Sequence, residues 1–181
     1  MIKPKGRYSM IDEIKKHIRG HLYMSGIQRS SDRVEKTNEV FSPTWLVNEI
    51  LDKFDQTIFT NVNKTFLDPC CGDGQALGEA LIRKVENGST FEQALSTIYG
   101  VDLMPDNVRL CQDRLLCGRE DLRHIVEQNI VCADGLRYHY RFDGSHPYDE
   151  PKPLIKIKKV KNSNPYINDL FSHPHLDDLY T

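Results

Sequence analysis

Three aspartates stand where the sequence could build a polar ligand site. Asp68, Asp102 and Asp134 each come directly after a short apolar run that is typical of a β-strand. Helical patterns separate these runs, and strands that alternate with helices predict parallel β-α-β units with right-handed crossovers. Parallel strands end at one edge of a sheet, which is where open α/β sheets bind ligands. We therefore expect the three carboxylates to face one shared pocket.

The aspartates suit the hydrogen-bond donors of a nucleoside. Asp102 could accept hydrogen bonds from both hydroxyls of a ribose. Asp134, which Gly135 follows, could accept one from an exocyclic amino group such as that of adenine. Another interpretation is that Asp102 only caps the helix that is predicted to begin at Pro105.

The segment 66–74, FLDPCCGDG, links the first strand to a helix. Its glycines and small residues let the backbone turn sharply and approach a ligand, and the helix N-terminus offers free amide groups. We expect Cys70 and Cys71 to be small side chains in this turn, because no second cysteine pair or spaced histidine set accompanies them as metal ligands. The later histidines and aspartates, at residues 173–178, are expected to be a solvated tail and not a metal site.

Helices and strands that must position these residues follow from the apolar spacing. Helices are predicted over residues 9–24, from Ser42 as cap with Pro43 in the first turn, and over 75–87, 91–96, 105–117 and 121–128. Strands are predicted over 65–68, 97–102 and 129–133. The helix after Ser42 should bury a face made of Leu46, Ile50, Leu51 and Phe54. Residues 154–160, LIKIKKV, alternate well enough for a further strand at a sheet edge.

These elements predict an α/β fold with a parallel, Rossmann-like sheet that is truncated after its third or fourth strand. We expect residues 1–38 to form an N-terminal helix and a polar linker, 39–160 a cofactor-binding domain, and 161–181 a tail that is partly disordered.

The charge, the apolar runs and the cysteines limit the classes of protein to which this chain could belong. The 181 residues have a net charge of −2, which divides into +4 over residues 1–40, −8 over 41–150 and +2 over 151–181. Basic ends beside an acidic centre could contact phosphates, or they could simply be solvated. No apolar run is long enough for a membrane span and the N-terminus has no signal-peptide pattern, so we expect a cytoplasmic protein, in the host cytoplasm if it is phage-encoded. Five cysteines, including a vicinal pair, argue against a disulfide framework.

Four segments, in order, resemble the motifs of S-adenosylmethionine-dependent methyltransferases, most closely the adenine-N6 DNA methyltransferases such as the small enzymes that phages encode. Residues 68–74 (DPCCGDG) are similar to the first cofactor motif, 100–104 (GVDLM) to the second and 133–136 (ADGL) to the third. Upstream, residues 39–47 (EVFSPTWLV) are similar to the family's N-terminal motif. Together they cover roughly residues 36–140.

The resemblance implies S-adenosylmethionine as cofactor and a role for each matching residue. The methionine end of the cofactor would lie against Phe41, Ser42 and Thr44, and over a turn that contains Asp68, Cys70, Gly72 and Gly74. Asp102 would bind the ribose, Leu103 and Met104 the faces of the adenine, and Asp134 the adenine amino group.

The family's catalytic motif, an Asn, Asp or Ser followed by Pro-Pro and an aromatic residue, has no intact counterpart. The best candidate is Ser163-Asn164-Pro165-Tyr166, in which Asn164, Pro165 and Tyr166 would carry catalysis; Ser145-His146-Pro147-Tyr148 is the weaker one. By resemblance, the polar side chain would hold the target amino group and the ring would stack on a flipped base.

The resulting expectation is an enzyme that methylates the N6 amino group of adenine in DNA, with no metal. Two alternatives remain open: a non-catalytic or partner-dependent S-adenosylmethionine-binding module, and a methyltransferase for RNA or protein. DNA is the expected partner, and a second copy or another subunit could complete the sheet.

Overall fold

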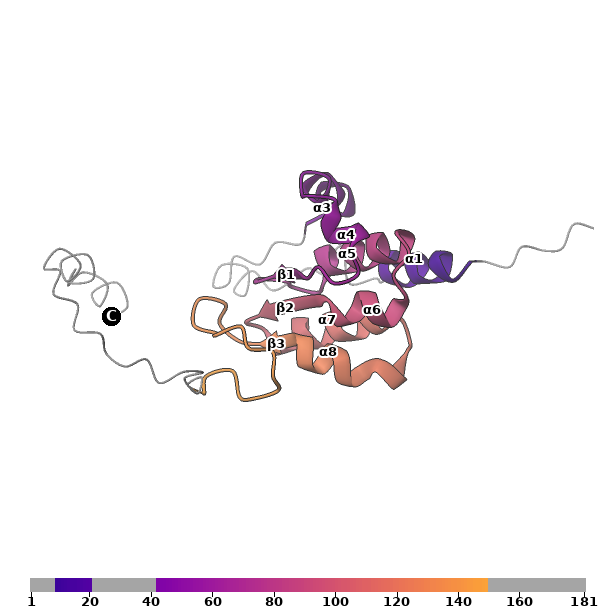
Figure 1. Ribbon diagram of the computed structural model, residues 1–181. Helices are drawn as coiled ribbons and strands as arrows, with labels where there is room; N and C mark the ends of the chain where they lie inside the picture. The colour runs from indigo at the N-terminus through magenta and orange to yellow at the C-terminus, as the bar shows by residue number, and fades with distance from the viewer. Residues whose placement is uncertain (1–8, 21–41, 150–181) are drawn as a thin grey trace, which may run out of the picture. The chain divides into compact units, whose positions relative to one another are not determined.

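The computed structural model describes residues 9–20 and 42–149 (Figure 1). The helices are α1 (Met10–Gly20), α3 (Thr44–Leu51), α4 (Thr57–Thr60), α5 (Gln75–Glu86), α6 (Phe91–Ser96), α7 (Pro105–Leu116) and α8 (Arg123–Asn129), with a 3-10 turn η2 at Glu120–Leu122. The strands are β1 (Phe66–Asp68), β2 (Ile98–Asp102) and β3 (Ile130–Cys132). None of the helices in these residues has the length and apolar character of a membrane span.

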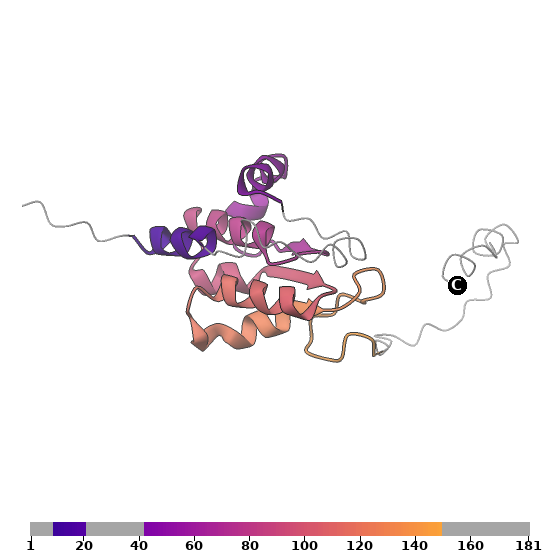
Figure 2. The same ribbon diagram turned by 180° about the vertical axis from the view of Figure 1, so that it is seen from behind.

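The predicted α/β class and the parallel sheet are confirmed. The three strands lie in the order β1-β2-β3, with Phe66 opposite Ile98 and Gly100 opposite Ile130. Figures 1 and 2 show the three arrows side by side, with the segment that follows β3 passing their tips. The arrangement is that of a small open sheet and is consistent with a Rossmann-like fold.

One face of the sheet packs against two helices. Helix α5 contacts β1 and β2, and helix α7 contacts β2 and β3. Phe66, Ile98 and Ile130 are buried on this face, as are Leu77 and Leu115 of the helices. Gly100 is needed there, because a Cβ atom would lie 2.7 Å from Leu77 Cδ1 and 2.9 Å from Cys71 Sγ. The core therefore lies between the sheet and these helices.

The other face is covered by the chain after β3. Val101, Ala133 and Tyr138 form a small buried cluster against which Val131 and Phe142 pack. At the β1 edge this cover ends, and Leu67 is 44% exposed. Within the described residues β1 pairs only with β2.

The start of α3 differs from the prediction. Pro43, and not Ser42, is the N-cap residue, and no side chain caps the helix. Its buried residues are Val47 and Leu51, whereas Ile50 and Phe54 are 48% and 43% exposed. The buried face is thus centred on Val47 and Leu51, which lie four residues apart, and Phe54 lies beyond the end of the helix at Leu51.

Two further differences concern short elements. Helix α4 was not predicted; it is a single turn that buries Phe59. The helix predicted over 121–128 begins as the 3-10 turn η2 and continues as α8. The predicted linker, the strand at 154–160 and the tail lie outside the described residues, so the domain limits at 38 and 160 stay predictions.

Candidate functional site

The turn after β1 is a compact loop held by backbone hydrogen bonds. Asp68 Oδ1 accepts a hydrogen bond from the Cys70 N–H (3.1 Å), and the Cys71 N–H donates to the Val101 carbonyl of β2 (2.9 Å). Gly72 and Gly74 have positive φ angles, +53° and +85°. A Cβ atom on Gly74 would lie 2.6 Å from Cys111 Sγ, so this position needs glycine both for its conformation and for the close contact with α7.

Asp102 joins this turn to helix α7. Its Oδ2 accepts a hydrogen bond from the Gly72 N–H (2.9 Å), and its Oδ1 accepts from the Met104 N–H (2.9 Å) and from Asn107 Nδ2 (3.2 Å). The carboxylate thus supports the start of α7, although the N-cap residue itself is Met104. A carboxylate has roughly four acceptor sites. Three are used, so Asp102 keeps the capacity to accept one more donor.

The end of β3 lies against the same turn. A Cβ atom on Gly135 would lie 2.7 Å from the Pro69 carbonyl oxygen, which places the two loops in direct contact. The Asp134 N–H donates to Tyr148 Oη (2.9 Å), while its Oδ1 accepts from the Leu136 N–H (2.9 Å). The loops at the ends of the three strands are therefore in contact, and of the three aspartates Asp68 lines the cavity beside them, whereas Asp102 and Asp134 do not.

The remaining predicted residues surround this junction. Ser42, Asp68, Cys70 and Gly72 line a cavity of about 90 Å³. Leu103 is 59% exposed beside Asp102, and Met104 is half-buried. Thr44 Oγ1 accepts a hydrogen bond from Nε2 of Gln75 (2.8 Å), a residue that also lines this cavity. Phe41, Asn164, Pro165 and Tyr166 lie outside the described residues.

The pKa values of three groups in this turn, Asp68, Cys70 and Cys71, are raised. Burial raises the pKa of Asp68, the Cys70 hydrogen bonds oppose this shift, and the charge of Asp102 adds to it. Burial and the two aspartates raise the pKa of Cys70. The buried thiol of Cys71 has a raised pKa because it hydrogen-bonds Cys111 and is desolvated. A protonated thiol is a poor nucleophile and metal ligand, which agrees with the small-residue interpretation.

No group of three metal-ligating side chains is present in residues 9–20 and 42–149.

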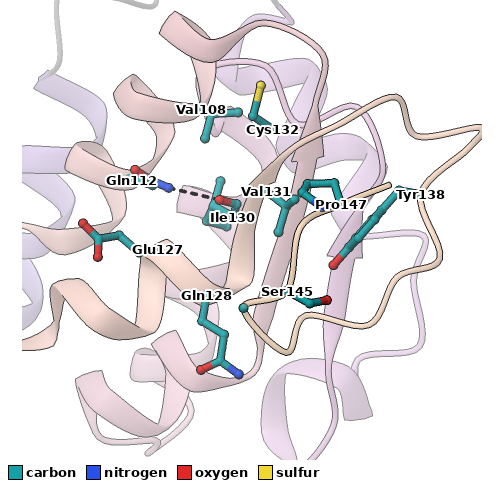
Figure 3. A pocket seen from close by; sticks show the side chains of 11 residues that line it. Val108, Gln112, Glu127, Gln128, Ile130, Val131, Cys132, Tyr138, Ser145 and Pro147 are labelled. Carbon is teal, nitrogen blue, oxygen red and sulfur yellow. Dashed lines mark hydrogen bonds between the residues drawn. The ribbon is translucent and has the colours of Figure 1, made fainter. Parts of the chain in front are cut away.

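A larger pocket lies on the outer side of β3, and Ser145 and Pro147 of the weaker catalytic candidate are among the residues that line it. It has a volume of about 420 Å³ and is lined by β3, by Val108 and Gln112 of α7, by Glu127 and Gln128 of α8, and by residues of the segment after β3 (Figure 3). The Gln112 amide closes part of the strand edge by donating to the Ile130 carbonyl (3.0 Å). This pocket contains none of the predicted cofactor residues.

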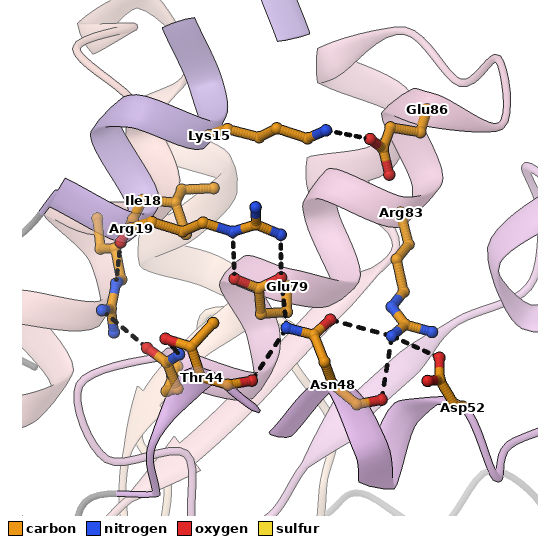
Figure 4. A network of polar contacts seen from close by, with 11 residues as sticks. Lys15, Ile18, Arg19, Thr44, Asn48, Asp52, Glu79, Arg83 and Glu86 are labelled. Atoms are coloured by element: carbon orange, nitrogen blue, oxygen red, sulfur yellow. Dashed lines mark hydrogen bonds and ion pairs between the residues drawn. The ribbon is translucent and has the colours of Figure 1, made fainter. Parts of the chain in front are cut away.

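A buried polar network that was not predicted lies beneath the turn (Figure 4). Arg114 and Glu79 are each 1% exposed, and Asp73 and Gln75 are also buried. The signal was present for Arg114, because it lies three residues after Cys111 on the face predicted to be inward. A charged residue at such a position indicates a buried partner elsewhere in the chain.

Neither a scan against protein-family models nor searches of the curated proteins and of the solved structures found a match for this chain.

Proposed function

We propose that this chain is an S-adenosylmethionine-dependent methyltransferase that acts on the N6 amino group of adenine in DNA. The observation that carries the proposal is the junction of three strand ends, in which Asp102 bonds Gly72 of the first turn and Gly135 packs on Pro69. A site at this edge of an open parallel sheet, with an acid after each strand, suits a nucleoside ligand.

The residues present fit the cofactor in chemistry. S-adenosylmethionine, when bound, supplies a methyl group on a positively charged sulfur, which an amino nitrogen can attack. Asp68 and Asp102 place negative charge where a cation would be favoured, and Asp102 has one acceptor site left for a ribose hydroxyl. Leu103 offers an exposed apolar surface for a base.

The cavity at this site is smaller than a pocket that would enclose the whole cofactor. The cavity beside Asp68 has about 90 Å³. Pockets that enclose a ligand of drug size have roughly 300–1,000 Å³. The described residues would thus provide one wall of the site, beneath the methionine end.

Calorimetric titration of S-adenosylmethionine into the protein tests the cofactor. We expect micromolar binding that Asp102→Ala weakens by about 1 to 3 kcal/mol, the size of a hydrogen bond to a charged group. Since Asp102 also supports two loops, Leu103→Ala is the cleaner variant, because this exposed side chain makes no bond that the fold needs. Val62→Ala, at the opposite end of β1, is the matched control and should leave binding unchanged. Absence of heat at millimolar ligand would reject the cofactor site.

Transfer of a labelled methyl group to DNA, RNA and protein tests the acceptor. DNA should be labelled, and its binding should weaken steeply with salt because basic groups at both ends of the sequence, near Lys3 to Arg7 and Lys156 to Lys161, would neutralise phosphates. Labelling of RNA or protein alone would move the proposal to that substrate class.

A second candidate function is a non-catalytic S-adenosylmethionine-binding module, alone or completed by another subunit. It is favoured because the sequence contains no two consecutive prolines and so lacks the family's catalytic motif. Activity lost on Tyr166→Ala would support the enzyme, whereas activity that is gained only with Asn164→Pro would support a degenerate module. Light scattering would show whether a second copy joins the chain.

A further inference from the structure

Helix α1 lies unusually close to α5, beside which it appears in both ribbon views (Figures 1 and 2). Ile14 and Ile18 of α1 are buried in the core. A Cβ atom on Gly78 of α5 would lie 2.6 Å from Ile18 Cγ2, so the two helices can approach this closely only because residue 78 is glycine. The position of α1 therefore depends on a glycine in α5.

A first chain of hydrogen bonds runs from the end of α1 to the hydroxyl of Thr44. Arg114 Nε donates to the Ile18 carbonyl (3.1 Å), and its Nη2 donates to Gln75 Oε1 (3.0 Å). Gln75 Nε2 in turn donates to Thr44 Oγ1 (2.8 Å). The same guanidinium holds the turn after β1, because Nη1 donates to the Asp73 carbonyl (3.0 Å) and lies 3.1 Å from its Oδ1.

A second chain runs from Arg19 to the backbone of Thr44 (Figure 4). Arg19 donates through Nε and Nη2 to the two oxygens of Glu79, at 2.8 Å each. Asn48 Nδ2 donates both to Glu79 Oε2 (3.1 Å) and to the Thr44 carbonyl (3.0 Å). Arg83 fixes the Asn48 amide from the other side by donating to its Oδ1 (3.0 Å).

We propose that α1 is a positioning element of the cofactor site: its docking fixes Thr44 at both its hydroxyl and its carbonyl, and fixes the turn at Asp73. This inference rests on the proposed function, since Thr44 and the turn are the predicted methionine-end contacts. Arg114, Gln75, Glu79 and Asn48 are the positioning residues.

The physical reason is that the buried charges can be satisfied in only one arrangement. Glu79 and Arg114 are almost wholly buried, and each uses α1 as one of its partners. If α1 moves away, a carboxylate and a guanidinium lose a partner inside the protein, where such a loss is costly. Rearrangement of Asn48 and Gln75 to recover those bonds would shift Thr44.

Two variants displace α1 by different means. Gly78→Ala wedges the helices apart at Ile18, and its Cβ atom would make only an ordinary contact with Arg114 Cδ, at 3.9 Å, so it removes no hydrogen bond of the network. Arg19→Gln removes the charged pair with Glu79 from a side chain that is half-exposed and not needed in the core. The matched control is Gly20→Ala, the same substitution at the end of α1, where a Cβ atom meets nothing within 4 Å.

The readouts are the affinity for S-adenosylmethionine and the fluorescence of Trp45, the only tryptophan, which is 68% exposed and adjacent to Thr44. We expect both displacing variants to weaken binding by about three- to tenfold and to change the emission and acrylamide quenching of Trp45. Gly20→Ala should change neither.

The two proposals fail in different ways. If the unaltered protein binds no S-adenosylmethionine, the proposed function fails, and the change in Trp45 fluorescence alone decides whether α1 positions this segment. If Gly78→Ala behaves like an alanine in an unobstructed helix, raising stability and leaving Trp45 and the affinity as they were, the positioning role of α1 is wrong.

Discussion

The turn after β1 and the segment after β3 occupy equivalent places, each beyond the end of a parallel strand and each beginning with an aspartate, yet they are held in different ways. Residues 68–74 are anchored by residues distant in sequence, above all by the buried Arg114 of α7, which bonds Asp73 of the turn and also the Ile18 carbonyl of α1, 96 positions away. Residues 134–148 are held by neighbours in sequence, such as the Tyr148 bond to Asp134 and the Phe142 N–H bond to Tyr138.

The two regions also differ in which residues carry strained backbone angles. In the turn, the positive φ angles belong to glycines. In the later segment Tyr140 and Phe142 adopt φ angles of +51° and +48°, which is unfavourable for residues with large side chains. Ring packing offsets this cost, since Phe142 lies 4.7 Å from Tyr99 and 5.4 Å from Tyr138 between ring centroids. We infer that the first region is fixed by buried charged groups of other elements, whereas the second is held by hydrogen bonds among its own residues and by ring packing on Tyr99 of β2.

The largest effect is expected from Arg114→Met. Removing the guanidinium leaves Asp73 and Gln75 without their buried donor and should lower the free energy of unfolding by about 3 to 5 kcal/mol. Urea unfolding followed by circular dichroism measures this loss. The matched control is Arg123→Met, whose ion pairs with Asp113 and Glu120 are at the surface, so that their loss should lower the stability far less. Equal losses would show that burial of the network adds nothing.

Gly135→Ala tests the contact between the two regions. The added methyl group would lie 2.7 Å from the Pro69 carbonyl oxygen, so the loops must separate, at a cost of about 1 to 3 kcal/mol. The same unfolding measurement applies, with Gly20→Ala as control because that site is open. A stability equal to that of the control would mean that the two regions are independent.

Within residues 134–148, one tyrosine hydroxyl makes its hydrogen bond at an exposed position, and the other belongs to a buried tyrosine. Tyr148→Phe should lower stability by less than about 1 kcal/mol, because the Asp134 N–H at this exposed position can bond water instead. Tyr138→Phe should cost more, since Tyr138 is buried and its hydroxyl accepts the Phe142 N–H. Thermal denaturation of the two variants gives the order, and the reverse order would contradict it.

The smallest effect concerns the charge of Asp68. Because burial raises its pKa above the ordinary 3.8, the charged form is disfavoured in the folded state, and stability falls as pH rises through the raised value. Asp68→Asn keeps an acceptor for the Cys70 N–H and removes this charge. At neutral pH it should therefore gain about 0.5 to 1 kcal/mol while it weakens cofactor binding. The gain should vanish below pH 3.8, and a gain that is constant with pH would exclude the charge as its cause.

Local sequence patterns were sufficient to predict most of the helices and strands. Helix α6 was predicted at its observed bounds, and the three strands to within one residue at either end, because alternating short apolar runs and helical spacing are properties of adjacent residues. The start of α3 was wrong: the Ser-Pro pair predicted Ser42 as the cap and Pro43 in the first turn, but Pro43 is the N-cap residue, and Val47 and Leu51 are the buried residues.

The spacing of Asp68, Asp102 and Asp134 determined that a polar site could form at one edge of the sheet, because the ends of parallel strands must meet there. Only the folded chain decided how that edge is supported. The bonds of Arg114 to Ile18 and of Glu79 to Arg19 join residues far apart in sequence, and such a pairing depends on which helix faces pack together. A charged residue at a position predicted to be buried indicates that it has a partner, but only the packing of the helices in three dimensions determines which residue that partner is.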